Sequence, residues 1–249
     1  MIDYENLLNI VKTENDLEDF LTEHDEWDYL YNLSNIRKNV LEWYDFREDA
    51  RLLEIGAECG AVTGLFCERV SEVVSFDSNE RKCEINRERN KAYSNLKVIS
   101  STEDLEEIKF DYVVIIADVS DASLNLASKM LKQDGILIIV AANRFGIKYF
   151  AGASDVGEIK RLGRKKLIDM LIRHFFTDMT FYYPIPDYVF TTEIFSENNL
   201  PKRGDIKSES PDFTDGTIRV FDEVKAIDDI CDDGDFEEFA NSFIVVCQN

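Results

Sequence analysis

The stretch from Arg51 to Phe66, RLLEIGAECGAVTGLF, has the residue types and spacing of a turn that could hold a ligand. An apolar run that contains Glu54 leads into the turn, and apolar residues at helical spacing follow it. The turn consists of Gly56, Ala57, Glu58, Cys59 and Gly60. A buried strand, a small-residue turn and a helix start, in this order, bring backbone N–H groups close to an anionic or zwitterionic ligand.

Glu58 departs from a full glycine-rich signature, because it occupies the position where a second glycine would let the backbone approach a ligand. Two interpretations of the turn are therefore equally good on its own sequence. In one it is a cofactor-binding turn, and in the other it is a tight strand-to-helix connection with no ligand.

Asp77 favours the ligand interpretation. It follows the predicted strand Val73–Phe76 and lies about 20 residues beyond the glycine turn, the spacing at which a carboxylate receives ribose hydroxyls in a Rossmann-type unit. The residues from Asp77 to Glu80 also fit a helix N-cap. A strand end and a helix cap are adjacent, so the two roles are compatible, and Ser78 becomes a further candidate contact.

Polar residues follow each of the predicted strands that must position such a site. Strands are expected at 52–55, 73–76, 96–100, 110–117 and 136–141, with helices between them. This alternation predicts a mostly parallel α/β sheet, whose ligands bind beyond the carboxyl ends of the strands. The polar residues at those ends are Glu54, Asp77, Glu103, Asp104, Asp118, Asn143 and Arg144.

The organisation predicted along the chain is a helical N-terminal cap at 1–46 and an α/β domain at 47–249. All four prolines lie in or beside an aromatic-rich excursion at 183–217. Its aromatic faces suit a sugar ring, and plain packing of the excursion explains them equally well. The aromatic residues assigned to a substrate surface are Tyr182, Tyr183, Tyr188 and Phe190.

The composition of the chain argues against several classes of function. The net charge of −22 over 249 residues argues against a nucleic-acid surface and against docking on anionic lipid. Five widely spaced cysteines without a C-x-x-C pair, and only two histidines, indicate reduced thiols in a cytoplasmic protein with no metal site. The N-terminus does not resemble a signal peptide, and no run reaches the ~18 apolar residues of a membrane span.

Several stretches together resemble a class I S-adenosylmethionine-dependent methyltransferase. The order of LLEIGAECGAVTG, FDSNE, FDYVVIIAD and LKQDGILIIVAANRFG is that of the class. YNLSNIRKNVLEW, NRFGIKYFAGA and FYYPIPDYVFTTEIFSENNLP are similar, more specifically, to methyltransferases of bacterial surface-polysaccharide and lipopolysaccharide biosynthesis clusters. The resemblance runs from about Tyr29 to the C-terminus.

The resemblance implies a Rossmann-like, mostly parallel seven-stranded sheet with helices on both faces and the last strand antiparallel. It implies that S-adenosylmethionine contacts the turn from Glu54 to Gly60, that Asp77 binds its ribose and that Glu103 and Asp104 lie at its adenine. The chain departs from the family in Glu58, in a shorter segment after the fourth strand and in lacking a histidine near the predicted mouth.

Without that histidine, the candidate catalytic bases are Asp118, Asp121 and Tyr149. Asp118 is also a candidate cofactor contact. Methyl transfer from a sulfonium needs little acid–base chemistry, because the cofactor carries its own leaving group. The absence of a catalytic motif is therefore no evidence of inactivity.

Two functions follow from these features. The first is methyl transfer to a small molecule or glycan precursor, with Asn143, Arg144 and the aromatic residues of the excursion at the substrate. The second is a non-catalytic methyltransferase-like binding or scaffold protein. Glu58 and the shortened segments favour the second, whereas Gly56, Gly60 and Asp77 favour the first.

Overall fold

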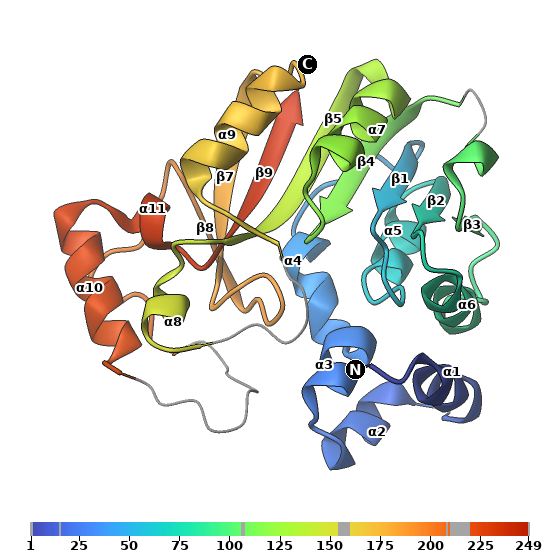
Figure 1. Ribbon diagram of the computed structural model, residues 1–249, viewed down its shortest axis with the longest axis horizontal. Coiled ribbons are helices and arrows are strands. Elements are labelled where there is room, and N and C mark those ends of the chain that lie inside the picture. The colour runs from blue at the N-terminus through green and yellow to red at the C-terminus, as the bar shows by residue number, and fades with distance from the viewer. Residues whose placement is uncertain are drawn as a thin grey trace.

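The computed structural model describes residues 2–14, 16–105, 108–153, 160–207, 209 and 220–248. Its strands form one nine-stranded sheet in the order β3-β2-β1-β4-β5-β9-β7-β8, with β6 beside β5 (Figure 1). The strands are β1 (Arg51–Ile55), β2 (Glu72–Phe76), β3 (Leu96–Ile99), β4 (Phe110–Ile116), β5 (Leu131–Asn143), β6 (Arg161–Leu162), β7 (Asp178–Ile185), β8 (Glu193–Ser196) and β9 (Ser242–Gln248).

The sheet is Rossmann-like and mixed. β1 to β6 pair in parallel, while β9 pairs antiparallel with both β5 and β7, so β7 runs in the same direction as β1 to β5. The antiparallel last strand is as expected, but the count of seven strands is wrong. The two short additions are β6, a two-residue pairing beside the end of β5, and β8, which returns antiparallel from β7 inside the proline-rich segment.

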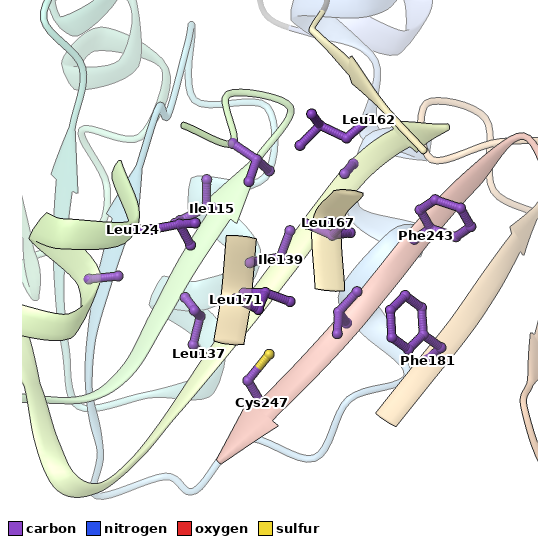
Figure 2. Packing of buried hydrophobic residues seen from close by; sticks show 14 of the residues in the cluster. Ile115, Leu124, Leu137, Ile139, Leu162, Leu167, Leu171, Phe181, Phe243 and Cys247 are labelled. Carbon is purple, nitrogen blue, oxygen red and sulfur yellow. The ribbon is translucent and has the colours of Figure 1, made fainter. Parts of the chain in front are cut away.

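The central strands are apolar on both sides because helices cover both faces. On one face, α7 (Asp121–Met130) and α9 (Arg164–Arg173) pack on alternate residues of the strands, such as Val113 and Ile139. Figure 2 shows Leu124, Leu167 and Leu171 reaching the sheet there. On the other face, α4 (Asn39–Glu42) and α5 (Thr63–Arg69) pack on the intervening residues. The pleat thus decides which core each strand residue joins.

The N-terminal helices lie beyond the arrowheads of β1 and β4 in Figure 1. They are α1 (Tyr4–Thr13), α2 (Leu17–Glu23), α3 (Trp27–Leu33) and the 3-10 turn η1 (Asn35–Lys38). Leu7 and Leu33 pack with Cys59 of the glycine turn and with Ile85 of α6 (Glu80–Arg89). Arg89 donates to the carbonyls of residues 32 and 33. These contacts hold α3 and η1 over the glycine turn.

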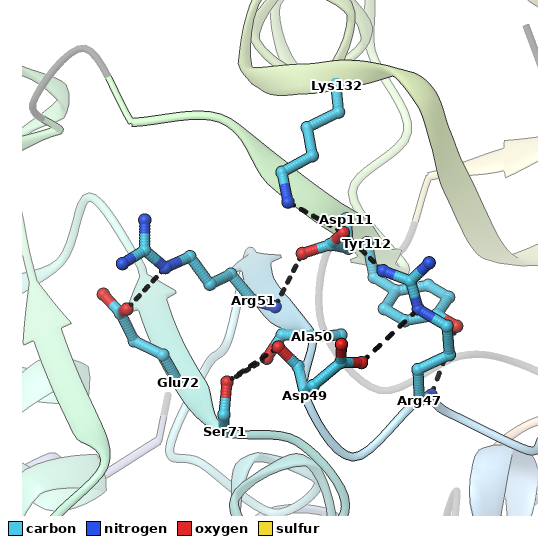
Figure 3. Close-up of polar contacts among 9 residues, drawn as sticks. All are labelled: Arg47, Asp49, Ala50, Arg51, Ser71, Glu72, Asp111, Tyr112 and Lys132. Atoms are coloured by element: carbon cyan, nitrogen blue, oxygen red, sulfur yellow. Dashed lines mark hydrogen bonds and ion pairs between the residues drawn. The ribbon is translucent and has the colours of Figure 1, made fainter.

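The opposite, amino-terminal edge of the sheet is held together by charges (Figure 3). Asp111 of β4 accepts hydrogen bonds from the Arg51 backbone and from Lys132 Nζ, and it also pairs with Arg47. Burial opposes ionisation of Asp111, but these donors together lower its pKa. The cluster joins β1, β4 and β5 at the end far from the glycine turn and helps to fix their register.

The remaining elements lie outside this framework. They are η2 (Thr102–Asp104), α8 (Ile147–Phe150), α10 (Glu223–Asp233) and α11 (Phe236–Phe239). The predicted excursion at 183–217 is described up to residue 207 and at 209, while 208 and 210–217 lie outside the described residues.

Candidate functional site

The glycine turn adopts left-handed backbone conformations. Gly56 and Gly60 have φ of 75° and 76°, and Glu58 between them has φ of 52°. The N–H groups of Gly56 and Ala57 both donate to the carbonyl of Phe76, at 2.8 and 3.1 Å. The turn is therefore closed against the end of β2. Left-handed backbone costs a glycine nothing but costs Glu58 about 1–2 kcal/mol.

Glu54 lies beneath the turn and is 2% exposed. It accepts hydrogen bonds from the hydroxyls of Thr63 and Ser75, at 2.6 and 3.0 Å. Asn86 Nδ2 donates in turn to both hydroxyls. Burial raises the pKa of Glu54 to about 7 against the opposing effect of the two hydroxyl donors, and the charge of Asp77 adds to the rise. This network supports the turn from below.

Asp77 lies at the end of β2 and is 7% exposed. Its Oδ2 accepts the backbone N–H of Glu58 at 3.0 Å, and its Oδ1 accepts that of Asn79 at 2.9 Å. A carboxylate offers about four acceptor sites, so two backbone bonds leave capacity for ligand hydroxyls. Asp77 thus links the glycine turn to the start of α6, in addition to any contact with a ligand.

Glu58 forms an ion pair across the turn. Its carboxylate lies 2.6 Å from Lys82 Nζ, and the two side chains are 35% and 17% exposed. Burial lowers the pKa of Lys82, but the charge of Glu58 and its hydrogen bond, with Asp77 and Tyr4, raise it overall. Lys82 therefore compensates much of the charge that Glu58 brings to the turn.

Three adjacent hollows follow the carboxyl edge of the sheet. The first is narrow, with a cavity volume of about 20 Å³, and lies between the N-terminal helices and the glycine turn. Its lining includes Tyr31, Asn32, Arg37, Glu54, Gly56, Ala57, Glu58, Cys59, Ala61 and Val62. The second, with a cavity volume of about 220 Å³, shares Tyr31, Gly56 and Glu58 with the first. It adds Asp77, Ser78, Lys82, Ala117 and Lys160.

The third hollow, with a cavity volume of about 460 Å³, shares Ile55, Phe76 and Asp118 with the second. Thr102 and Leu126 also line it, from η2 and from α7. The shared residues place the three hollows side by side along this edge, and together we call them the groove. The groove starts under the N-terminal helices, passes the glycine turn and Asp77, and ends beside α7.

Asp118 lies where the second and third hollows meet, and it is exposed. Its backbone N–H donates to the carbonyl of Ile116 at 2.9 Å, and Ala117 between them has φ of 67°. A hydrogen bond across three residues with a positive central φ is a γ-turn, which is rare and strained. The strained turn ends β4 and places Asp118 at the groove.

Glu103 and Asp104 do not line the groove. Both are exposed on η2, and it is Thr102 of the same turn that reaches the third hollow. The expected strand-end loop is present, but the 3-10 turn directs a different residue inward.

Asn143 was expected at the substrate, but it is fully buried. Its amide donates to the carbonyls of Glu238 and Ala240, and its Oδ1 accepts the N–H of Phe145. Asn143 therefore joins the end of β5 to the segment before β9. Arg144 is exposed and lines a separate hollow beside α9.

Tyr183, which was also expected at the substrate, lies away from the groove in the core. It is 0% exposed, its phenol donates to Glu237 at 2.6 Å, and it packs against Phe236 and Phe243. These residues belong to the core on the face opposite to that of Tyr182. Successive strand residues point to opposite faces, so the pair cannot share one surface.

Tyr188, Phe190 and Tyr182 lie towards the carboxyl edge, because β7 ends there. Tyr188 is buried beside Arg37. Phe190 packs on Trp27 of α3, and Tyr182 packs on Trp43. Asp187 forms an ion pair with Lys148, with 2.7 Å between Oδ2 and Nζ, and both residues are buried.

Two of the proposed bases lie away from the groove. Asp121, at the start of α7, faces α9 and contacts His174 Nε2 at 3.0 Å and Arg173 at 3.6 Å. Tyr149 is on α8, with Arg161 4.3 Å from its ring. Neither residue lines the groove, so Asp118 is the one of the three candidates that does.

Sequence reasoning missed several groove residues. Tyr31 and Arg37 lie in the predicted helical N-terminal cap. Asn32, Lys82 and Lys160 carried no motif. Their positions depend on how helices pack, which spacing along the chain does not reveal. Among the described residues, no three His, Cys, Asp or Glu side chains gather as metal ligands.

No protein-family model and no curated protein matches the sequence. Solved structures match the fold of the chain. A SAM-dependent methyltransferase from Archaeoglobus fulgidus superposes with a TM-score of 0.57 at 18% identity, covering 93% of this chain and 99% of that one. The N-methyltransferase NodS from Bradyrhizobium japonicum, in complex with S-adenosylhomocysteine, gives 0.53 at 13% identity, with 99% and 97% covered.

The phosphoethanolamine N-methyltransferase 1 of Haemonchus contortus gives a TM-score of 0.54 at 14% identity, over 99% of this chain and 50% of that one. Together with the strand order, these likenesses show that the chain has the Rossmann-like fold of class I methyltransferases. Within the described ranges, no helix has the length and apolar character needed to cross a membrane.

Proposed function

We propose that the chain is an enzyme that transfers a methyl group from S-adenosylmethionine. The observation that carries the proposal is the groove at the carboxyl edge of a methyltransferase fold. Its three hollows match the three parts of the cofactor: an amino-acid end at the glycine turn, a ribose at Asp77, and an adenine between Phe76 and Leu126. Bound there, the cofactor supplies an electrophilic methyl group and its own leaving group.

The chain's own residues orient the cofactor and handle the proton. Asp77 has free acceptor capacity for ribose hydroxyls, and Thr102 offers a hydroxyl at the adenine end. Asp118, exposed at the junction of two hollows, is the candidate to accept a proton from the acceptor group.

The proposed acceptor is a hydroxyl of a sugar or polysaccharide precursor in cell-surface glycan biosynthesis. Its support is the sequence resemblance, together with the aromatic side chains of Tyr182 and Phe190 at the carboxyl edge. Both are only partly buried.

Calorimetric titration with S-adenosylmethionine and S-adenosylhomocysteine tests the cofactor assignment. Asp77→Asn is expected to weaken binding at least tenfold, because a hydrogen bond to a charged group contributes about 1.5–3 kcal/mol. Asp104→Asn is the matched control, since this exposed carboxylate lies outside the groove. Equal dissociation constants for wild type and Asp77→Asn remove Asp77 from the site.

The second candidate function is a non-catalytic binding protein. The strained Glu58 in the turn favours it, because a side chain there narrows the approach to the backbone. Absence of heat with either ligand at millimolar concentration is the result that supports it.

A further inference from the structure

Arg37 is a buried cation without an anionic partner among the described residues. It is 4% exposed, and its side chain makes one hydrogen bond, from a terminal nitrogen to the Tyr31 carbonyl at 3.3 Å. Its Nε is buried without a partner, and no carboxylate of the described residues pairs with it. A buried guanidinium in this state is unfavourable, because it has lost its water and gained no counter-charge.

Aromatic rings hold the guanidinium in place. Its carbon lies 4.0 Å from the ring centre of Tyr31 and 5.7 Å from that of Tyr188. Cation–π contacts offset part of the lost hydration, but the rings do not accept the hydrogen bonds that the guanidinium N–H groups can donate. The excursion after β7 thus helps to hold Arg37 in the position that η1 gives it.

Arg37 lines the first hollow together with Asn32, whose Oδ1 is also buried without a partner. One hollow therefore carries an unsatisfied cationic donor and an unsatisfied acceptor. A guanidinium pairs best with a carboxylate, and an amide oxygen accepts from an ammonium group. An α-amino-acid zwitterion supplies both groups on neighbouring atoms.

The charges around the hollow agree with this ligand. Glu54 and Glu58 are its acidic lining residues. Glu54 accepts bonds from two hydroxyls below the turn, and Glu58 is paired with Lys82. Arg37 is the cation among the lining residues described, so it is the group placed to balance a ligand carboxylate.

We propose that Arg37 binds the α-carboxylate, and Asn32 the α-ammonium, of the amino-acid end of S-adenosylmethionine. This inference rests on the proposed function. The N-terminal helices then complete the cofactor site.

The test compares two ligands and two variants. S-adenosylhomocysteine carries the amino-acid end, whereas 5′-deoxy-5′-methylthioadenosine keeps the adenosine and thioether but lacks it. Arg37→Met is expected to weaken the binding of S-adenosylhomocysteine at least 30-fold and the binding of the second ligand less than threefold. Arg81→Met is the control. Arg81 of α6 forms an ion pair with Glu5 of α1, one of the N-terminal helices, but it lies outside the hollow.

A structural role for Arg37 predicts different results. If Arg37 serves only the fold, Arg37→Met lowers the melting temperature of the ligand-free protein, and both ligands weaken together. In the proposed role the ligand-free variant is at least as stable as wild type, because an unpaired buried charge has been removed. Arg37→Lys, which keeps the charge, provides the same ligand comparison if the methionine variant fails to fold.

The outcomes separate the two proposals. If wild type binds neither ligand, the proposed function fails and this inference fails with it. If wild type binds S-adenosylhomocysteine and Arg37→Met binds it equally well, or loses both ligands equally, the proposed function stands and the role of Arg37 is refuted.

Discussion

Glu54 shows how a single buried residue can make stability depend on pH. Its pKa in the folded protein is about 7, compared with an ordinary value of 4.5. Between these values the folded state binds more protons than the unfolded state, so stability falls as pH rises. The loss of folding stability caused by ionising Glu54 is absent below about pH 4.5 and complete above about pH 7. Its size is about 3 kcal/mol.

Glu54→Gln is therefore expected to flatten the pH profile, because glutamine is neutral throughout. Urea denaturation at pH 5 and pH 8 measures the effect. The loss of stability between the two pH values should be smaller in the variant by about 2–3 kcal/mol, because part of the penalty is already present at pH 5. Parallel profiles for variant and wild type would show that Glu54 ionises normally in the folded state.

Glu58 combines a strained backbone with an ion pair, and two substitutions separate them. Glu58→Gln breaks the pair with Lys82 and keeps the positive φ, so it should lower the free energy of unfolding by on the order of 1–2 kcal/mol. Glu58→Gly also breaks the pair but relieves the backbone, so its loss should be smaller by about 1 kcal/mol. Chemical denaturation of both variants checks this, and equal losses would mean that the backbone is unstrained.

At the scale of elements, the glycine turn depends on its packing against α6. A Cβ at Gly60 would lie 2.2 Å from Asn86 Oδ1 and 2.8 Å from Asn90 Nδ2, and φ is 76°. These asparagines hydrogen-bond each other and, through Asn90, the carbonyl of Gly60. The turn and the helix are thus fitted to each other without room for a methyl group.

Gly60→Ala is expected to lower the free energy of unfolding by about 2–4 kcal/mol, from left-handed strain and overpacking together. Gly234→Ala is the matched control, because φ there is 82° but nothing lies within 4 Å of an added Cβ. The control should lose only the backbone part, about 1–2 kcal/mol. Equal losses at the two sites would contradict the steric part of the argument.

For the whole molecule, the dominant electrostatic property is the net charge of −22. Self-repulsion of this size opposes the compact state, and salt screens it. Raising NaCl to about 0.5 M should therefore raise the melting temperature near pH 8. For a chain of this length, about 1 kcal/mol corresponds to about 2–4 °C. Near pH 4.5, where many carboxylates are protonated, the gain should shrink, and an unchanged gain would point to ion-specific binding instead.

The sequence alone determined the order of strands and helices from β1 to β5 and the place of the groove. Both depend on local patterns, namely apolar runs, a glycine pair and an acid at a strand end, and parallel strands necessarily present their carboxyl ends together. Gly56 and Asp77 line the groove, and the signals that pointed to them depend on neighbours close in the chain.

Only the tertiary structure decided which side chains face the groove. The pleat sends Tyr183 to the far core, and the segment before β9 buries Asn143. Helix packing brings Arg37 and Lys82 to the glycine turn from either side of it in the chain. Such placements depend on contacts between distant segments, and these follow from how whole elements pack rather than from spacing along the sequence.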